Sequence, residues 1–183
     1  ASTSAFNMIP TNGNDLGNQL KTVAKLVQAS GPLSMKRQIF FVATGGYDTH
    51  GDQIGPQAQL LGGVSAALKG FQDALDSVNM GAQVTTFTAS DFNRTYDSNG
   101  RGSDHGWGSH HFVVGGAVKG GAFYGSAPSA LLKGPEDVGQ GRLLPTTSVD
   151  QYAATMARWF GVADSEMTQI TPNIGYFDSA NLG

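Results

Sequence analysis

The sequence contains no cysteine and little charge, and both absences limit what the chain can bind. Without cysteine there are no disulfides and no thiolate ligands, so a metal ion would be held by oxygen and imidazole ligands. Charged residues make up 14% of the chain, the formal net charge is -3, and lysine and arginine form no run. These properties argue against nucleic acid as a partner. No stretch approaches the roughly 20 apolar residues of a membrane span, so we expect no such span.

The remaining composition is that of a globular chain with many turns. Hydrophobic residues account for 39% of the 183 residues, and 26 residues are glycine. A chain of this length fits one domain, which we place over residues 1–183.

The hydrophobic pattern of the first half predicts alternating helices and strands. Apolar residues at helical spacing indicate helices, and short apolar or β-branched runs indicate buried strands. The predicted elements are a helix from Asn14 to about Gly31, a strand over 38–43, a helix over 56–80 and a strand over 83–89. Strand, helix and strand form a βαβ unit with a right-handed crossover. We therefore predict an α/β fold with a mainly parallel sheet flanked by helices.

The second half is predicted to contain less regular structure. A short strand is expected over 111–114, a return over 117–124 and an irregular stretch over 125–145. A last helix follows, with Thr147, Ser148 and Asp150 as capping candidates. Its predicted apolar face contains Tyr152, Met156, Trp159 and Phe160. After residue 161 the chain is expected to be irregular.

Histidine is scarce, yet all four histidines follow predicted strands. One follows the first strand, and three lie within seven positions of the run GSDHGWGSHHFVVGG, residues 102–116. In open α/β sheets ligands bind outside the carboxyl ends of the strands, and imidazole and carboxylate groups are ligands of divalent cations. Two of the histidines lie near an aspartate on a glycine-rich loop. The predicted metal ligands are Asp48, His50, Asp104, His105 and one of His110 and His111.

Several residues near these histidines have two interpretations. Neighbours in an extended segment point to opposite faces, so His110 and His111 are expected to differ in role. Asp91, at the end of a predicted strand, is either a further ligand or a cap for the next turn. Arg94 either binds an anionic group of a substrate or pairs with Asp91 or Asp97. A single histidine near an aspartate is more often a hydrogen-bonded residue than a ligand, and it is the clustering that favours a site.

Three runs of the sequence resemble a known family. RQIFFVATGGYDTHGDQ, VTTFTASDFNRT and GSDHGWGSHHFVVGGAVKGG closely resemble a large bacterial family of unknown function, whose members often carry a twin-arginine export signal. That family in turn is similar to a distant branch of the alkaline phosphatase and sulfatase superfamily. The resemblance implies an alkaline-phosphatase-like fold, a periplasmic or secreted location and one or two divalent metals at strand ends. It also implies that residues 1–183 are the C-terminal part of a larger domain.

The resemblance also implies roles for individual residues. Asp48 and His50 resemble the first aspartate and histidine pair of the superfamily, and Asp104-His105 resembles its Asp-His-Gly motif. His110 or His111 resembles the late histidine ligand. The position of Asp91 leaves open whether it or Asp104 is a ligand.

The expected function is that of a divalent-metal-dependent hydrolase of phosphate or sulfate esters. The metal is expected to be zinc, which suits imidazole ligands, whereas calcium or manganese would suit a site with more carboxylates. Arg94 would hold the anionic ester substrate. The superfamily's nucleophile comes from earlier strands, so the N-terminal segment of the same precursor is the expected partner. The alternative is an exported binding or structural protein without catalysis, in which a metal or a hydrogen-bonded His/Asp cluster braces the loops.

Overall fold

The computed structural model describes residues 3–177. Its elements are η1 (Thr3–Met8), α1 (Asp15–Gln28), α2 (Ile54–Ser77), η2 (Gly81–Gln83), β1 (Thr86–Phe87), β2 (Asn93–Ser98), β3 (Ser103–Gly106), β4 (Val113–Val114), α3 (Val149–Phe160), η3 (Asp164–Glu166), α4 (Met167–Ile170) and η4 (Pro172–Tyr176). The chain divides into two compact units. Unit 1 contains residues 1–91, 98–104 and 110–120, and unit 2 contains residues 92–97, 105–109 and 121–183. Within residues 3–177, no helix is long and apolar enough to cross a membrane.

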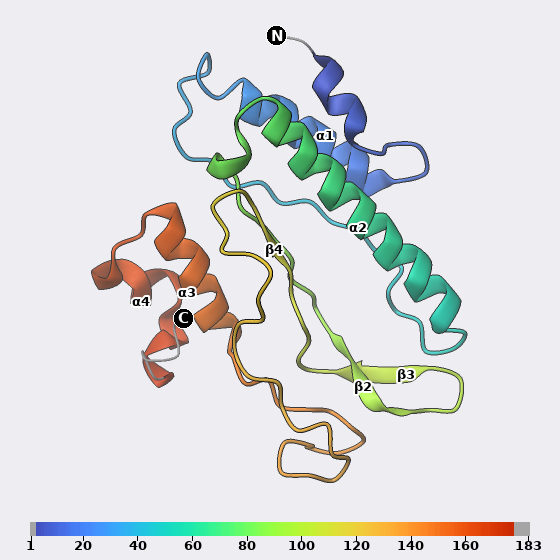
Figure 1. Cartoon of the computed structure of the whole chain (residues 1–183). Helices are drawn as coiled ribbons and strands as arrows, with labels where there is room; N and C mark the ends of the chain where they lie inside the picture. The colour runs from blue at the N-terminus through green and yellow to red at the C-terminus, as the bar shows by residue number, and fades with distance from the viewer. Residues whose placement is uncertain (1–2, 178–183) are drawn as a thin grey trace. The chain divides into compact units, whose positions relative to one another are not determined.

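The core of unit 1 forms between α1 and α2, which lie side by side in Figure 1. Asn14 begins α1, because its side chain accepts a hydrogen bond from the backbone N–H of Gly17 at 3.0 Å. Both helices were predicted; each ends three residues earlier than predicted, and α2 begins two residues earlier. The buried residues of this core are Phe6, Ile9, Leu16, Leu20, Val23, Ala24, Val27, Ala67, Phe71, Ala74 and Leu75.

A glycine of α2 allows the segment after η1 to pack tightly against the helix. A Cβ atom at Gly70 would lie 2.6 Å from the carbonyl oxygen of Met8 and 2.8 Å from Cδ of Pro10. No real Cβ makes such contacts without a shift of the backbone. Glycine at position 70 lowers the helix propensity of α2, but because it has no Cβ it permits close packing with Met8–Pro10.

The strand predicted over 38–43 is not formed in the structure. The segment is extended, and two of its apolar side chains, Phe40 and Val42, pack against the core of unit 1. A strand also requires a hydrogen-bonded neighbour. Here the backbone of one residue, Ala43, is paired in this way, and its partner is a side chain: the amide of Gln19 donates to the carbonyl of Ala43 at 2.8 Å and accepts from its N–H at 3.0 Å.

The other predicted strands are shorter and pair differently from the prediction. Only Thr86–Phe87 of the strand over 83–89 and Val113–Val114 of the strand over 111–114 are regular, and β1 pairs with β4 antiparallel. One further bond, from the N–H of Thr88 to the carbonyl of Phe112 at 3.0 Å, extends this ladder. The strands of residues 3–177 thus do not form the expected βαβ unit. The alkaline-phosphatase-like parallel sheet stays a prediction.

A hairpin of β2 and β3 occupies the region between the predicted strands. The two strands are hydrogen-bonded neighbours joined by residues 99–102, a connection too short for parallel strands. This hairpin was not predicted. It carries Asp104 and His105 on β3.

Unit 2 has a small core beneath α3. Ser148 caps the helix with a complete capping box, in which it exchanges hydrogen bonds with Gln151. The buried residues are Ala154, Met167 and Ile174. The predicted apolar face is wrong in part, because Trp159 is exposed while Ala154 is buried. The tail after residue 161, expected to be irregular, forms η3, α4 and η4.

The two glycine environments of α2 predict opposite effects of the same substitution. Gly70→Ala should lower the free energy of unfolding by about 1–3 kcal/mol, because the new methyl group overpacks the contact with Met8. Gly62→Ala should raise it by up to about 1 kcal/mol, because nothing lies within 4 Å of its added Cβ and alanine favours the helix. Urea denaturation of both variants measures the difference. Equal effects would contradict the close packing at Gly70.

Candidate functional site

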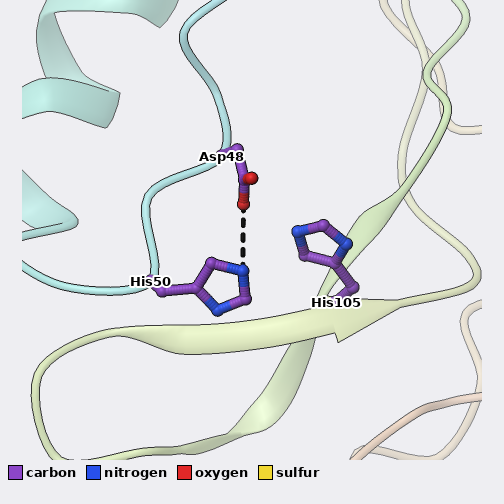
Figure 2. A group of neighbouring side chains, drawn as sticks. All are labelled: Asp48, His50 and His105. Carbon is purple, nitrogen blue, oxygen red and sulfur yellow. Dashed lines mark ion pairs between the residues drawn. The ribbon is translucent and has the colours of Figure 1, made fainter.

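The side chain of His50 lies between two carboxylates of unit 1. Its Nε2 atom is 3.0 Å from Oδ1 of Asp48, the ion pair drawn in Figure 2, and its Nδ1 atom is 3.1 Å from Oδ1 of Asp104. Asp48 and His50 follow the extended segment 38–43, and Asp104 lies on β3. The sequence predicted two separate acid–imidazole pairs, whereas the structure joins His50 to the aspartate of each pair.

A neutral imidazole has one N–H, so it can donate to only one of the two carboxylates, Asp48 or Asp104. Its other ring nitrogen then faces a carboxylate oxygen, an arrangement that a proton or a cation between the two atoms would relieve. The side chains of Asp48, His50 and Asp104 are 62%, 50% and 48% exposed, so an ion can reach them from solvent.

Asn99 fixes the position of both His50 and Asp104. Its Nδ2 atom donates to the carbonyl of His50 at 3.0 Å and to Oδ1 of Asp104 at 3.1 Å. Its Oδ1 atom accepts from the N–H groups of Arg101 and Gly102 at 3.1 and 2.8 Å. One amide therefore closes the hairpin turn and ties it to the backbone of His50. Sequence reasoning did not identify Asn99, although Asn99-Gly100 is a frequent hairpin turn dipeptide.

His105 belongs to unit 2, directly after Asp104 in the chain. Its ring stacks on Phe92 with the ring centroids 4.0 Å apart and 7° between the planes. Its carbonyl accepts from Nε of Arg142 at 3.1 Å. These contacts fix the ring and backbone of His105, the histidine drawn on β3 in Figure 2.

The remaining predicted site residues have surroundings of their own. Arg94 lies on β2 in unit 2, where its guanidinium is 5.1 Å from the centre of the Phe92 ring. This is a cation–π arrangement. Asp91 is an exposed residue at the end of the first segment of unit 1, between β1 and β2. It is not one of the carboxylates that bind His50.

His110 and His111 have different surroundings, as predicted for neighbours. Nδ1 of His111 lies 3.2 Å from the hydroxyl of Thr88, which also accepts from the N–H of Phe112 at 2.9 Å. The Thr88 hydroxyl therefore lies between the ring of His111 and the backbone of Phe112. Burial, and then the charge of His110, lower the pKa of His111 from its usual 6.5. Thr88 was not singled out in the sequence.

A lowered pKa makes His111 a source of pH-dependent stability in the metal-free protein. As the pH falls, the unfolded chain takes up a proton on His111 before the folded chain does. The stabilisation is therefore fully present above pH 6.5 and is lost as the pH falls through the lower folded pKa. In His110→Gln the pKa of His111 should rise but stay below 6.5, because burial is the larger cause. Histidine titrations by NMR measure both values. Titration of His111 at or above 6.5 in the unaltered protein would contradict this account.

Comparison with known proteins gives a family but no relative of known activity. A family model described as "Protein of unknown function (DUF1501)" matches residues 10–173. No curated protein and no solved structure is similar enough to match the chain. The matched range contains all the residues of the candidate site.

Proposed function

Since the chain belongs to the DUF1501 family, whose description assigns no activity, we propose a function from the site: a divalent-metal-dependent hydrolase of phosphate or sulfate esters. The observation that carries the proposal is the chain of contacts from Asp104 through His50 to Asp48. A histidine that binds a metal usually donates its other ring N–H to a carboxylate, which fixes the tautomer and the ring orientation. Asp104 stands in that relation to His50.

The distances agree with a bound cation. Ligand atoms of a tetrahedral zinc site lie about 3.3 Å apart. Nε2 of His50 and Oδ1 of Asp48 are 3.0 Å apart, so they resemble one edge of such a tetrahedron. Within this proposal Asp48 and His50 are ligands, and Asp104 is a positioning residue.

Further ligands are proposed from the sequence pattern. His105 follows Asp104 on β3, and its imidazole is the proposed third ligand because Asp104-His105 resembles the superfamily's Asp-His-Gly motif. Asp91 and one of His110 and His111 remain candidates for additional positions. Zinc is the proposed metal; calcium or manganese would take its place if most of the ligands are carboxylates.

In the proposed reaction the bound metal would act as a Lewis acid on an ester oxygen. The residues of the chain hold and orient it: Asp104 keeps the proton of His50 on Nδ1, and Asn99 holds both residues in register. The nucleophile is proposed to come from the N-terminal segment of the same precursor, as in the alkaline phosphatase and sulfatase superfamily. A periplasmic or secreted location belongs to the same proposal.

The open face of the segment 38–43 supports a partner of this kind. Phe40 and Val42 face the core of unit 1, whereas Ile39 and Phe41 are 81% and 93% exposed. This alternation is typical of a strand whose one face packs against the core and whose other face is apolar but exposed to solvent. An added strand from the precursor would pair the backbone of the segment, and a helix of the precursor packed on the predicted parallel sheet would bury Ile39 and Phe41.

One observation also favours a second function, a structural brace without catalysis. A doubly protonated His50 would donate one N–H to Asp48 and the other to Asp104, which satisfies both ring nitrogens without a metal. The His/Asp cluster would then only hold the hairpin turn against residues 48–50.

Zinc titration of chelator-treated protein tests the metal site. One zinc ion should bind per chain, and His50→Ala and Asp48→Ala should each weaken binding by about tenfold or more. Asp104→Asn should weaken it by a factor of about 10–100, because His50 loses the carboxylate that orients it. Asp73→Asn is the matched control, since this carboxylate lies on α2 and pairs with Lys69.

Two further results decide between the hydrolase and the brace. Turnover of phosphate or sulfate esters by the intact precursor, lost in His105→Ala, supports the hydrolase. Absence of zinc binding together with a loss of thermal stability in His50→Ala supports the brace.

Adjacent phenylalanines test the open face of the segment 38–43. Phe40→Ala should lower the free energy of unfolding by about 2 kcal/mol or more, because Phe40 packs against the core. Phe41→Ala should change it by less than about 0.5 kcal/mol, because the side chain is exposed. Chemical denaturation measures both. In the intact precursor the amides of residues 38–42 should exchange more slowly than in this chain. A large effect of Phe41→Ala on this chain alone would mean that the face is already covered.

A further inference from the structure

Unit 1 contains a pocket of about 510 Å³. Its lining comes from the start of α2 and from the turn between β2 and β3. The lining residues used below are Gln53, Gln57, Arg101 and Gly102.

Two walls of the pocket are in contact with residues 47–50. A Cβ atom at Gly102 would lie 2.7 Å from the carbonyl oxygen of His50, so this wall lies directly against the His50 backbone. On the other wall, Nε2 of Gln57 donates to the carbonyl of Tyr47 at 3.1 Å and to the hydroxyl of Thr49 at 3.0 Å. The pocket therefore adjoins the segment that carries Asp48 and His50.

Arg101 is the cation of this pocket. Its Nη2 atom is 3.4 Å from Oδ2 of Asp52, and the two side chains are 76% and 87% exposed. An exposed ion pair at this distance is weak, because solvent screens the charges and both side chains lose freedom on pairing. A guanidinium has five N–H donors in a planar fork, and this contact uses one of them. An anion in the pocket can therefore replace Asp52 at little cost.

Gln53 supplies a second group of donors. Its Oε1 atom accepts from the hydroxyl of Ser103 at 2.8 Å, which fixes the orientation of the amide. The Nε2 atom of the same amide can donate two hydrogen bonds. Arg101 and Gln53 thus offer N–H donors from two walls of one pocket, a combination that suits the oxygens of a tetrahedral oxyanion.

We propose that Arg101 and Gln53 bind the phosphate or sulfate oxyanion of the substrate, in the role that the sequence assigned to Arg94. This inference rests on the proposed hydrolase function. It is also a statement about anion binding that can be measured without turnover. Arg94 has a different environment, because its guanidinium lies over the ring of Phe92 in unit 2.

Titration of the purified chain with inorganic phosphate and with sulfate tests the proposal. Binding is followed by calorimetry and by the amide shifts of Gln53 and Gly102, with and without one equivalent of zinc. Arg101→Ala should weaken phosphate binding at least tenfold. Arg101→Lys should weaken it less, because an ammonium keeps the charge but not the fork.

Asp52→Asn gives a prediction of opposite sign. Removing the carboxylate frees Arg101 and should tighten phosphate binding several-fold, and asparagine tolerates the positive φ of 49° at this position. Arg158→Ala is the matched control, since this arginine pairs with Asp164 in unit 2 and should leave binding unchanged.

The outcomes separate this inference from the proposed function. Phosphate binding that responds to Arg101→Ala and Asp52→Asn supports the anion site, and failure of zinc to bind would then overturn only the hydrolase. If zinc binds but neither Arg101→Ala nor Asp52→Asn changes the affinity for phosphate, the role of Arg101 is overturned. Loss of phosphate binding in Arg94→Ala but not in Arg101→Ala, with both variants folded by circular dichroism, also overturns it.

Discussion

The hydrogen bond between His50 and Asp104 is the contact on which the candidate site depends. It joins two segments that are 54 residues apart in the sequence, the stretch before α2 and the strand β3. Because Nδ1 of His50 lies against Asp104, Nε2 is the nitrogen that faces Asp48. The direction of the imidazole follows from this one contact.

Such a contact would be weak if nothing else held its partners. Both side chains are about half exposed, and exposed ion pairs usually stabilise by less than about 1 kcal/mol. Asn99 supplies the missing rigidity, because it bonds the His50 carbonyl, the Asp104 carboxylate and the turn itself. The geometry is therefore set by backbone contacts of a neutral amide and not by the strength of the ion pair. This is how an exposed site can be preorganised without burying its charges.

The sequence predicted what is local and failed where contacts are distant. The helices α1, α2 and α3 follow from apolar periodicity and from caps such as Asn14 and Ser148. The run 38–43 has strand composition, but a strand exists only when another segment pairs with it, and no local pattern reports that pairing. The same limit applies to the site. Clustered histidines and aspartates indicated the chemistry, whereas the contact of His50 with Asp104 depends on a turn that only Asn99-Gly100 could have predicted.

Two features of unit 1 that look unrelated have one explanation under the proposed function. Ile39 and Phe41 expose an apolar strand face, and a few residues later Asp48 and His50 expose ligand atoms on the same segment. In a parallel sheet a strand is covered along its faces, while the residues just after its carboxyl end stay open for ligands. A strand added beside residues 38–43 would end near Asp48, which is where a nucleophile for the proposed metal site has to come from. Under that proposal, the exposed apolar face and the exposed side chains of Asp48 and His50 would both follow from the missing neighbour of the extended segment 38–43.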